Sequence, residues 1–394
     1  MSEDFDAKTF VEQQVQAIKK TVGEAKVLIA VSGGVDSTVS AVLTHRSIGS
    51  NLVCVFIDDN FMRLNEPQRV KEVLSASPLS LPVKVLDERR RFMAALKGLS
   101  DAEEKRKAFR ETFYRVLGDA VKRERCSYLV QGTIKADVVE TAGGIKTQHN
   151  VLEQIGINPV ERFGFKVIEP LVALYKYQVR EVGRLLGAPR EVSERQPFPG
   201  PGLSVRVVGE IKSNKLEELK KATVVVEESF EDLGADQYFA AIFDEAYEEE
   251  DWKEPCKASS ALGSTVSCLK FSVLRDRGTG ILGGDRAYGK IATVSGREVV
   301  VEASWDRLRR LQRELQTVHP EVTRILYDIG GRSKGEYLLA VRAVKTKDYI
   351  TAEVAEVPWT LLKKVAESVL EACPNVSKVY FDITPKPPAT IEFE

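Results

Sequence analysis

In the stretch "VLIAVSGGVDSTVSAVL" (27–43), an apolar run ends at Ser32, Gly33 and Gly34, and a helical pattern begins at Asp36. Glycines allow backbone N–H groups to approach an anion without a Cβ in the way. The first turn of a helix adds unpaired N–H donors and a favourable dipole. Because open parallel sheets bind ligands at the carboxyl ends of their strands, this order predicts a phosphate-binding turn after a central strand.

The chemistry of this turn differs from that of a Walker loop. No G-x-x-x-x-G-K-[ST] pattern occurs in the sequence, and the turn carries an aspartate, Asp36, and no lysine. A carboxylate beside phosphates is suited to holding Mg²⁺. The alternative is an ordinary strand-to-helix turn with a serine cap, but the full S-G-G-V-D-S-T pattern between strand and helix favours nucleotide binding.

The surrounding sequence alternates between strand and helix patterns. Helical spacing at 8–20 and 36–48 and a long charged helical stretch at 88–124 separate apolar strand-like runs at 26–31, 51–58, 82–87, 127–133 and 165–171. This alternation predicts an α/β domain with a doubly wound parallel sheet, spanning 1–208. The proline- and glycine-rich stretch "RQPFPGPGLSVRV" (195–207) interrupts the pattern, as either a linker or a rigid loop.

The rest of the chain is predicted to be α+β and contains a tandem repeat. The segment "PEVTRILYDI" (320–329) matches "PNVSKVYFDI" (374–383), and Trp305 and Trp359 recur at the same spacing of 54 residues. One register therefore fits helix and strand together. We expect two units, 209–332 and 333–394, that bury each other's apolar sheet faces. Because both tryptophans recur at the repeat period, we expect them to pack in the core.

Composition limits the possible function classes. The chain has 394 residues, 43% hydrophobic and 29% charged, with a formal net charge of −1. This balance disfavours a nucleic-acid partner. The five cysteines form no C-x-x-C pair, so we expect buried thiols in a reducing compartment. The acidic N-terminal segment does not resemble a signal peptide, and no apolar run is long enough to cross a membrane, so we expect a cytoplasmic protein.

The S-G-G-V-D-S segment resembles the signature of the PP-loop ATP pyrophosphatases, which have an adenine nucleotide alpha hydrolase-like fold. The resemblance narrows to the GMP synthase family, and it is carried in order along most of the chain by "EEKRKAFRETF" (103–113), "QGTIKADVVET" (131–141), "IKTQHN" (145–150), "EPLVALYKYQVR" (169–180), "PFPGPGL" (197–203), "GGDRAYG" (283–289) and "KPPATIEFE" (386–394). The proline-rich loop and the last segment are the most specific of these motifs.

The resemblance implies a ligase that uses ATP and Mg²⁺. The C2 oxygen of xanthosine monophosphate (XMP) is adenylated with release of pyrophosphate, and ammonia then displaces AMP to give GMP. By resemblance, ATP is bound by Ser32, Gly33, Gly34, Val35, Asp36, Ser37, Thr38 and Gly132. Asp36 and Asp137 are the implied Mg²⁺ ligands, and Lys176 is implied to place its charge on the leaving pyrophosphate.

The implied catalytic set is completed by Asp137, Glu140, Lys146 and His149, and the implied XMP-binding set is Arg106, Asp285, Arg286, Lys386 and Glu392. Lys146 and His149 lie in a glycine-led segment that resembles a lid over the reactants. The chain departs from the family pattern at two places. Gln148 stands where the family usually has the first of two histidines, and "GGDRAYG" is one residue shorter than the usual form, which puts the role of Arg286 in doubt more than that of Asp285.

No block of the sequence resembles a glutaminase domain, so we expect ammonia to come from a separate glutamine amidotransferase subunit. The repeat leaves the oligomeric state open between a homodimer and a monomer with an internal pseudo-dimer. Two other functions stay open from the sequence. One is another PP-loop enzyme, of the NAD synthetase or RNA thiolase type, and the other is a nucleotide-binding regulatory paralogue.

Overall fold

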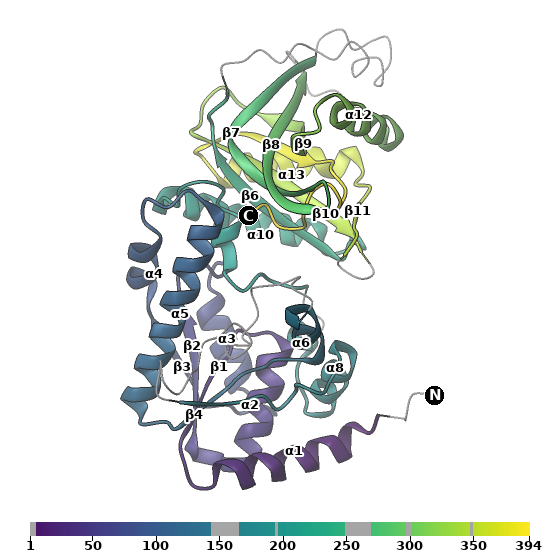
Figure 1. The fold of residues 1–394 in the computed structure, drawn as a ribbon. Coiled ribbons are helices and arrows are strands. Elements are labelled where there is room, and N and C mark those ends of the chain that lie inside the picture. The colour runs from purple at the N-terminus through teal and green to yellow at the C-terminus, as the bar shows by residue number, and fades with distance from the viewer. Residues whose placement is uncertain (1–4, 143–164, 194–195, 249–268, 297–301, 347–349) are drawn as a thin grey trace. The chain divides into compact units, whose positions relative to one another are not determined.

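The structure is a computed structural model that describes residues 5–142, 165–193, 196–248, 269–296, 302–346 and 350–394 (Figure 1). The chain forms two compact units. The first comprises Met1–Ala95 and Lys107–Gly200, and the second comprises Leu96–Arg106 and Pro201–Glu394. This division differs from the predicted boundaries after residues 208 and 332, because both repeats share one sheet in the second unit.

The first unit contains the predicted parallel sheet. Its five strands have the order β3-β2-β1-β4-β5 and all pair in parallel. The strands are β1 (Val27–Ala30), β2 (Leu52–Asp58), β3 (Val83–Asp87), β4 (Tyr128–Val130) and β5 (Lys166–Ile168). From β1 the chain continues to β2 and β3 on one side of β1, and it then crosses to β4 and β5 on the other side of β1. The ends of β1 and β4 therefore flank the switch point at which such sheets bind ligands.

The helices of the first unit cover both faces of this sheet (Figure 1). Right-handed crossovers that run in opposite directions along the sheet place their helices on opposite faces. Helices α1 (Ala7–Val22), α2 (Val35–Ile48), α3 (Glu66–Ser75) and α8 (Lys176–Leu185) share one hydrophobic core with β1 and β2. The connection from β3 to β4 carries α4 (Arg89–Leu96) and α5 (Ala102–Glu124), and the short helices α6 (Lys135–Ala142) and α9 (Arg190–Ser193) follow β4 and β5. The predicted doubly wound α/β domain is confirmed.

The charged stretch 88–124 is two helices and not the single long helix that the sequence suggested. Gly98 adopts φ 77°, which ends the helical path after α4. Asp101 then caps α5, because its Oδ1 accepts the amides of Glu103 at 3.0 Å and Glu104 at 2.9 Å. This restart places Glu103 and Arg106 in the first turns of α5.

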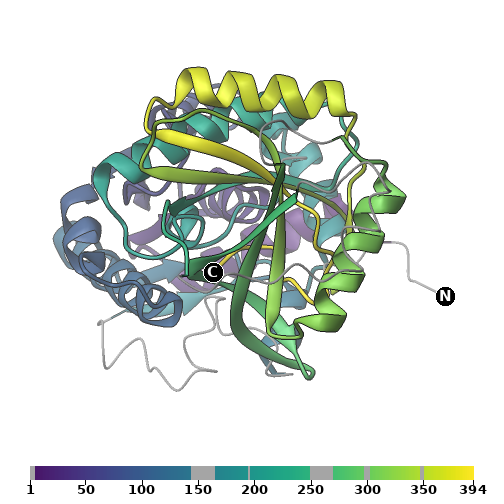
Figure 2. The same ribbon diagram turned by 90° about the horizontal axis from the view of Figure 1, so that it is seen from above.

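The second unit contains a mixed sheet with the order β11-β10-β12-β9-β8-β7, and β6 also pairs with β10 (Figure 2). The strands are β6 (Gln237–Asp244), β7 (Leu269–Leu282), β8 (Asp285–Gly296), β9 (Val322–Gly331), β10 (Tyr337–Lys345), β11 (Glu353–Val354) and β12 (Val376–Asp382). Helix α10 (Ser213–Phe230) and the short 3₁₀ helix Gly202–Val205 precede these strands, and α12 (Trp305–Val318) and α13 (Trp359–Ala372) connect them.

The sheet has the approximate two-fold symmetry that the repeat predicts. Strand β8 pairs antiparallel with β7 and parallel with β9. In the same way, β10 pairs antiparallel with β6 and parallel with β12. The two halves meet where β9 and β12 pair antiparallel, with Tyr327 opposite Phe381. These two residues are equivalent positions of the repeat, so the symmetry axis passes between them.

Equivalent residues make reciprocal contacts across this axis. Trp305 donates its indole N–H to the carbonyl of Val357 at 3.2 Å, and Trp359 donates to the carbonyl of Ala303 at 2.7 Å. The ring of Trp305 packs edge-on against Phe381, and that of Trp359 packs edge-on against Tyr327. The predicted packing role of both tryptophans is thereby confirmed.

The prediction that the two units bury each other's sheet faces is wrong, because the two repeats share one sheet and are joined edge to edge through β9 and β12. Strand β6 lies before β7 in the chain, within the predicted unit 209–332, yet it completes the half-sheet of the other repeat by pairing with β10. Local sequence similarity does not reveal this, because β6 is separated from β10 by the whole first repeat. The "GTGILG" stretch (278–283) lies at the β7–β8 hairpin.

Three cysteines, Cys54, Cys126 and Cys373, are buried free thiols, as expected, whereas Cys256 and Cys268 lie outside the described residues. Within the residues that the structure describes, no helix is both long and apolar enough to cross a membrane.

Candidate active site

The turn after β1 has the geometry that an anion requires. Gly33 adopts φ 79°, in the left-handed region that favours glycine, and Gly34 precedes α2 as its N-cap residue. No side chain among the described residues caps this helix. The first amides of α2 are therefore directed at the edge of the sheet where β1 ends, and they supply donors and a positive dipole end to a ligand.

Two serine hydroxyl groups brace the turn. Ser37 Oγ accepts the amide of Ser32 at 3.1 Å and lies 3.1 Å from Ser32 Oγ. It also donates to the carbonyl of Gly34 at 3.2 Å, while Gly34 donates its amide to Ser32 Oγ at 3.4 Å. Both serines keep the loop in shape, and either hydroxyl would have to exchange its present partner in order to donate to a ligand.

Two other predicted ATP-binding residues contribute differently. The side chains of Val35 and Thr38 are buried, at 5% and 0% exposure, and Val35 belongs to the hydrophobic core of the first unit. Only the backbone N–H groups of these residues are therefore suited to phosphate contact, because the side chains are directed into the protein.

Asp36 and Lys176 meet beside the turn. Asp36 lies in the first turn of α2, Lys176 is the first residue of α8, and Lys176 Nζ forms a hydrogen-bonded ion pair with Asp36 Oδ2. The other carboxylate oxygen, Asp36 Oδ1, is buried and has no hydrogen-bond partner among the described residues. A buried carboxylate oxygen without a partner is costly, so it indicates a place where a cation or donor belongs.

The end of β4 lies against the same turn. A Cβ added to Gly132 would lie 3.0 Å from the backbone carbon of Asp36 and 3.0 Å from the amide nitrogen of Ser37. Gly132 therefore permits a backbone approach that no other residue allows. Asp137 follows in the first turn of α6, where its Oδ2 accepts the amide of Ile134 at 3.0 Å.

These residues fit a Mg²⁺ ion that is bound jointly with nucleotide. Mg²⁺ in nucleotide sites commonly takes one or two carboxylates and completes its shell with phosphate oxygens and water. The unpartnered Asp36 Oδ1 is one such ligand. No group of three or more His, Cys, Asp or Glu side chains suited to a metal occurs among the described residues.

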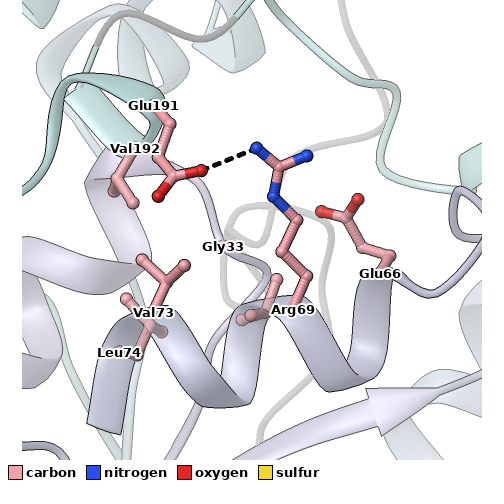
Figure 3. Close-up of a pocket in the computed structure, with 8 residues that line it drawn as sticks. Gly33, Glu66, Arg69, Val73, Leu74, Glu191 and Val192 are labelled. Atoms are coloured by element: carbon pink, nitrogen blue, oxygen red, sulfur yellow. Dashed lines mark hydrogen bonds and ion pairs between the residues drawn. The ribbon is translucent and has the colours of Figure 1, made fainter. Parts of the chain in front are cut away.

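Gly33 also lines a pocket next to the turn (Figure 3). One wall comes from α3, with Glu66, Arg69 and the apolar side chains of Val70, Val73 and Leu74. The other wall comes from α9, with Glu191 and Val192. Arg69 Nη2 and Glu191 Oε2 form an ion pair of 2.7 Å across this pocket, as the dashed line in the figure shows. The phosphate-binding turn thus borders a hollow with both apolar and charged walls.

A second cluster of functional residues lies in the second unit. We call Glu103, Arg106, Arg286 and Tyr288 the Glu103 cluster. The Oε1 atom of Glu103 accepts from Tyr288 OH at 2.7 Å and lies 3.4 Å from Arg106 Nη1 and 3.5 Å from Arg286 Nη2. Two guanidinium groups share one carboxylate, so the cluster carries excess positive charge.

The electrostatics of the Glu103 cluster favour an anionic ligand. Burial, together with the charge of Arg286, lowers the pKa of Arg106. Burial and the hydrogen bond to Glu103 raise the pKa of Tyr288 to about 12, so its hydroxyl stays protonated at neutral pH. A phosphate near these groups would supply the missing negative charge and accept from both guanidinium groups.

The segment 386–394, which we call the tail, lies against the same unit. Ile281 of β7, which pairs with Arg286, donates its amide to the carbonyl of Pro388 at 2.7 Å. Glu392 forms a bidentate ion pair with Arg206, with both N–O distances 2.9 Å. Lys386 exchanges backbone hydrogen bonds with Ala352 at 2.8 and 2.9 Å. The structure thus brings Arg106, Arg286 and the tail to one region of the second unit.

Asp285 is exposed at the start of β8, after a turn in which Gly283 and Gly284 adopt φ 62° and 94°. Glu140 lies in α6. Lys146, Gln148 and His149 lie outside the described residues, so the lid prediction stays a prediction.

Comparison with known proteins agrees with this geometry. Residues 7–187 match the PP-loop domain family, and residues 329–393 match the GMP synthase C-terminal domain family. The chain is 43% identical over 391 residues to a subunit of glutamine-hydrolyzing GMP synthase from Sulfurisphaera tokodaii, and the match covers 99% of this chain and 100% of that relative. It is 40% identical over 390 residues to the equivalent subunit from Methanopyrus kandleri, again with 99% and 100% coverage.

The chain belongs to this family of glutamine-hydrolyzing GMP synthase subunits. Among solved structures, NMN synthetase from Francisella tularensis matches 51% of this chain and 79% of its own, with a TM-score of 0.40 and 17% identity.

Sequence reasoning within the GMP synthase resemblance missed several residues at these sites. Glu103 and Tyr288 lie inside the quoted motifs and adjoin predicted residues, so their motif positions were the available signal. Arg206, which pairs with Glu392, lies 186 positions away, and only the fold joins the two. Arg69 and Glu191 on the pocket wall form a pair 122 positions apart, for which the sequence carries no signal.

Proposed function

We propose that this chain is the ATP pyrophosphatase subunit of a two-subunit GMP synthase. It adenylates the C2 oxygen of XMP with ATP, releases pyrophosphate, and admits ammonia, which displaces AMP and gives GMP. The observation that carries this proposal is the uncapped amide turn after β1, where Lys176 and a partnerless oxygen of Asp36 stand together. Family membership supplies the substrate class.

In the first step the C2 oxygen of XMP forms a bond to the α-phosphorus of ATP, and the bond to the β-phosphate oxygen breaks. Pyrophosphate leaves with the electron pair. The amides of α2 and the hydroxyl groups of Ser32 and Ser37 are placed to bind the departing unit as donors. Lys176 adds a point charge there, held close by Asp36.

Asp36 and Asp137 would hold Mg²⁺ together with the phosphate oxygens. When bound, the ion neutralises charge on the leaving group. The pairing of Lys176 with only one oxygen of Asp36 leaves the other oxygen available to the cation, so one carboxylate serves both groups.

XMP is proposed to lie against the second unit. The excess positive charge of the Glu103 cluster is suited to the phosphate of the nucleotide. Lys386 on the tail is suited to the phosphomonoester, Glu392 is suited to sugar hydroxyl or purine N–H groups, and Arg206 orients Glu392. Asp285 completes the proposed XMP-binding set.

Ammonia attacks C2 of the adenylated XMP and AMP leaves with the bonding electron pair. Glu140, Lys146 and His149 are the proposed residues for proton handling and closure in this step. Ammonia is proposed to come from a separate glutamine amidotransferase subunit, because the relatives are named as one subunit of a glutamine-hydrolyzing enzyme. The proposed compartment is the cytoplasm, where these water-soluble substrates are found.

The test is the steady-state formation of AMP from ATP by the purified chain. We expect strict dependence on XMP, Mg²⁺ and ammonium, with one GMP per AMP, and no GMP from glutamine alone. AMP formation with nicotinic acid adenine dinucleotide in place of XMP would instead indicate the NAD synthetase reaction. A chain that binds nucleotide without turnover would be the regulatory paralogue.

We further propose that the repeats form the internal equivalent of a homodimer contact, and that the chain is a monomer. The indole hydrogen bond and the ring contact of Trp305 each have a counterpart at Trp359, as an isologous interface requires. Two more reciprocal pairs join Arg324 to Asp382 and Lys378 to Asp328, both with N–O distances of 2.9 Å.

A further inference from the structure

The tail is attached to the second unit by an unusual buried charge arrangement. Arg324 and Arg342 are both fully buried, and both donate to the same oxygen, Asp382 Oδ2, at 2.9 and 2.6 Å. One carboxylate thus faces two guanidinium groups. A buried charge without a full counter-charge requires additional acceptors.

Backbone carbonyl groups at and before the tail supply those acceptors. Arg342 donates to the carbonyl of Thr384 at 2.9 Å and to that of Thr390 at 3.0 Å. Arg324 donates to the carbonyl of Thr390 at 3.0 Å and to the carbonyl of Glu392. The guanidinium of Arg324 also lies 4.0 Å from the centre of the Phe393 ring. The tail therefore supplies hydrogen-bond acceptors to two buried cations, although the Nε atoms of both have no hydrogen-bond partner among the described residues.

The approximate symmetry of the sheet provides an internal comparison. Arg324 and Asp382 on the tail side correspond to Lys378 and Asp328 on the other side, by the 54-residue spacing. Ile291 pairs with Arg324 in one repeat and Leu338 pairs with Lys378 in the other, so Ile291 and Leu338 are equivalent positions. Ser295 lies four residues beyond Ile291, and Arg342 lies four residues beyond Leu338. Arg342 therefore corresponds to Ser295. Ser295 Oγ lies 3.4 Å from Lys378 Nζ.

The two sides therefore differ in charge. The side without a tail has one cation for one carboxylate, whereas the side with the tail has two cations for one carboxylate. The extra cation, Arg342, is the group that donates to the carbonyls of Thr384 and Thr390. The sheet alone does not require it, because the symmetric position holds a serine.

From these contacts we infer that Arg342, with Arg324 and Asp382, is a positioning residue that holds the tail in the conformation that binds XMP. The inference rests on the proposed function, in which Lys386 and Glu392 contact that substrate. Lys386 lies between the anchored carbonyls of Thr384 and Thr390, and Glu392, two residues beyond Thr390, itself accepts from Arg324 through its carbonyl. Arg206 fixes the carboxylate of Glu392, and Lys105 binds Glu394, at the far end of the same segment.

The expected consequence is a change in substrate affinity and not in chemistry. When only a fraction of molecules holds the tail in the binding conformation, the apparent dissociation constant rises by the inverse of that fraction. Bound XMP restores the conformation, so kcat at saturation is retained. ATP binding at the turn after β1 is unaffected by the tail conformation.

The test compares Arg342→Met and Arg342→Lys with the symmetric control Lys378→Met, which removes a cation from Asp328 without touching the tail. For Arg342→Met we expect KM for XMP to rise about tenfold or more, with kcat within about threefold and KM for ATP within about twofold. Arg342→Lys keeps the charge and folds under milder strain, and we expect an intermediate KM for XMP. Lys378→Met should leave KM for XMP unchanged.

Hydrogen exchange gives a second measurement that needs no substrate. Peptides covering 383–394 should exchange faster in both Arg342 variants and at the wild-type rate in Lys378→Met. Unchanged exchange of these peptides in the Arg342 variants would overturn the anchoring, whatever the substrate is. Faster exchange with unchanged KM for XMP would overturn the positioning role. A wild-type chain that neither binds nor uses XMP would overturn the proposed function, and the exchange data would still report on the anchoring.

Discussion

At the scale of single residues, the turn after β1 brings together charges that lie far apart in the chain. Asp36 and Lys176 are 140 positions apart, and the fold places them in one ion pair beside the first amides of α2. The sequence identified both residues separately through motifs. Their direct contact, and the partnerless second oxygen of Asp36, follow only from the structure.

Replacing Lys176 tests the role of its charge. In Lys176→Met we expect kcat for XMP-dependent AMP formation to fall by about 10²–10³, because one preorganised charge on the leaving group is lost. Lys176→Arg should recover part of the loss. The control is Lys84→Met on β3, which removes an exposed 3.6 Å pair with Glu124 and should leave kcat unchanged. A Lys176→Met enzyme with wild-type kcat would exclude a role in charge stabilisation.

The buried cysteines make a prediction about reactivity. Burial raises the pKa of Cys54 and of Cys373 to about 12 and that of Cys126 to about 11. Because the thiolate is the reactive form, native protein at pH 8 should be alkylated at these three positions at least about 100-fold more slowly than an exposed thiol. Peptide mass spectrometry after iodoacetamide treatment measures this, with guanidinium-unfolded protein as the control. Rapid native alkylation of any of the three would show that its site opens.

At the scale of elements, the site depends on how closely the end of β4 approaches the start of α2. Gly132→Ala would place a Cβ 3.0 Å from the backbone of Asp36 and Ser37, so the first turn of α2 must shift. We expect kcat/KM for ATP to fall by about tenfold or more, because small displacements of a preorganised site reduce rates strongly. KM for XMP should be retained, since its proposed residues lie in the second unit.

Gly183→Ala is the matched control for that change. Its Cβ would meet the same helix, but at methyl groups of Val35 and Val39, 3.2 and 3.4 Å away, which can turn aside. We expect kcat/KM for ATP within about threefold of the wild type for this variant. Equal losses in both variants would mean that general strain on α2, and not the backbone at the turn, controls ATP use.

The elements also show what the sequence could predict. The alternation of apolar strands and helices predicted the five-strand parallel sheet, because each of those strands pairs with neighbours that the local pattern already identifies. The break between α4 and α5 was missed although Gly98 and Asp101 signal it, since the charged composition on both sides continues the helical pattern. The place of β6 beside β10 and the anchoring of the tail depend on long-range pairing, which local patterns do not encode.

At the scale of the whole molecule, the duplicated half-sheets are the basis for proposing a monomer. Two repeats of one chain make reciprocal contacts with each other. The repeat spacing predicted the two-fold relation and left the oligomeric state open. The sequence did not predict that only one of the two equivalent positions binds the tail, because that depends on the difference between Arg342 and Ser295 and on where the last residues fold.

We therefore expect light scattering of the purified chain at micromolar concentration to give the mass of one chain. Because the paired repeats are covalently joined, the free energy of unfolding should not depend on protein concentration.

Trp359→Ala removes a half-buried ring and its 2.7 Å hydrogen bond to Ala303, and it should lower the free energy of unfolding by about 2–4 kcal/mol. Trp305→Ala should have a similar effect, since its contacts are reciprocal. Denaturant titrations at two concentrations a hundredfold apart measure both quantities. A mass of two chains, with a midpoint that rises with concentration, would show that the repeats do not replace the contact between copies. In that case the internal symmetry would no longer imply that each chain has one substrate site and that each pair of repeats has one tail.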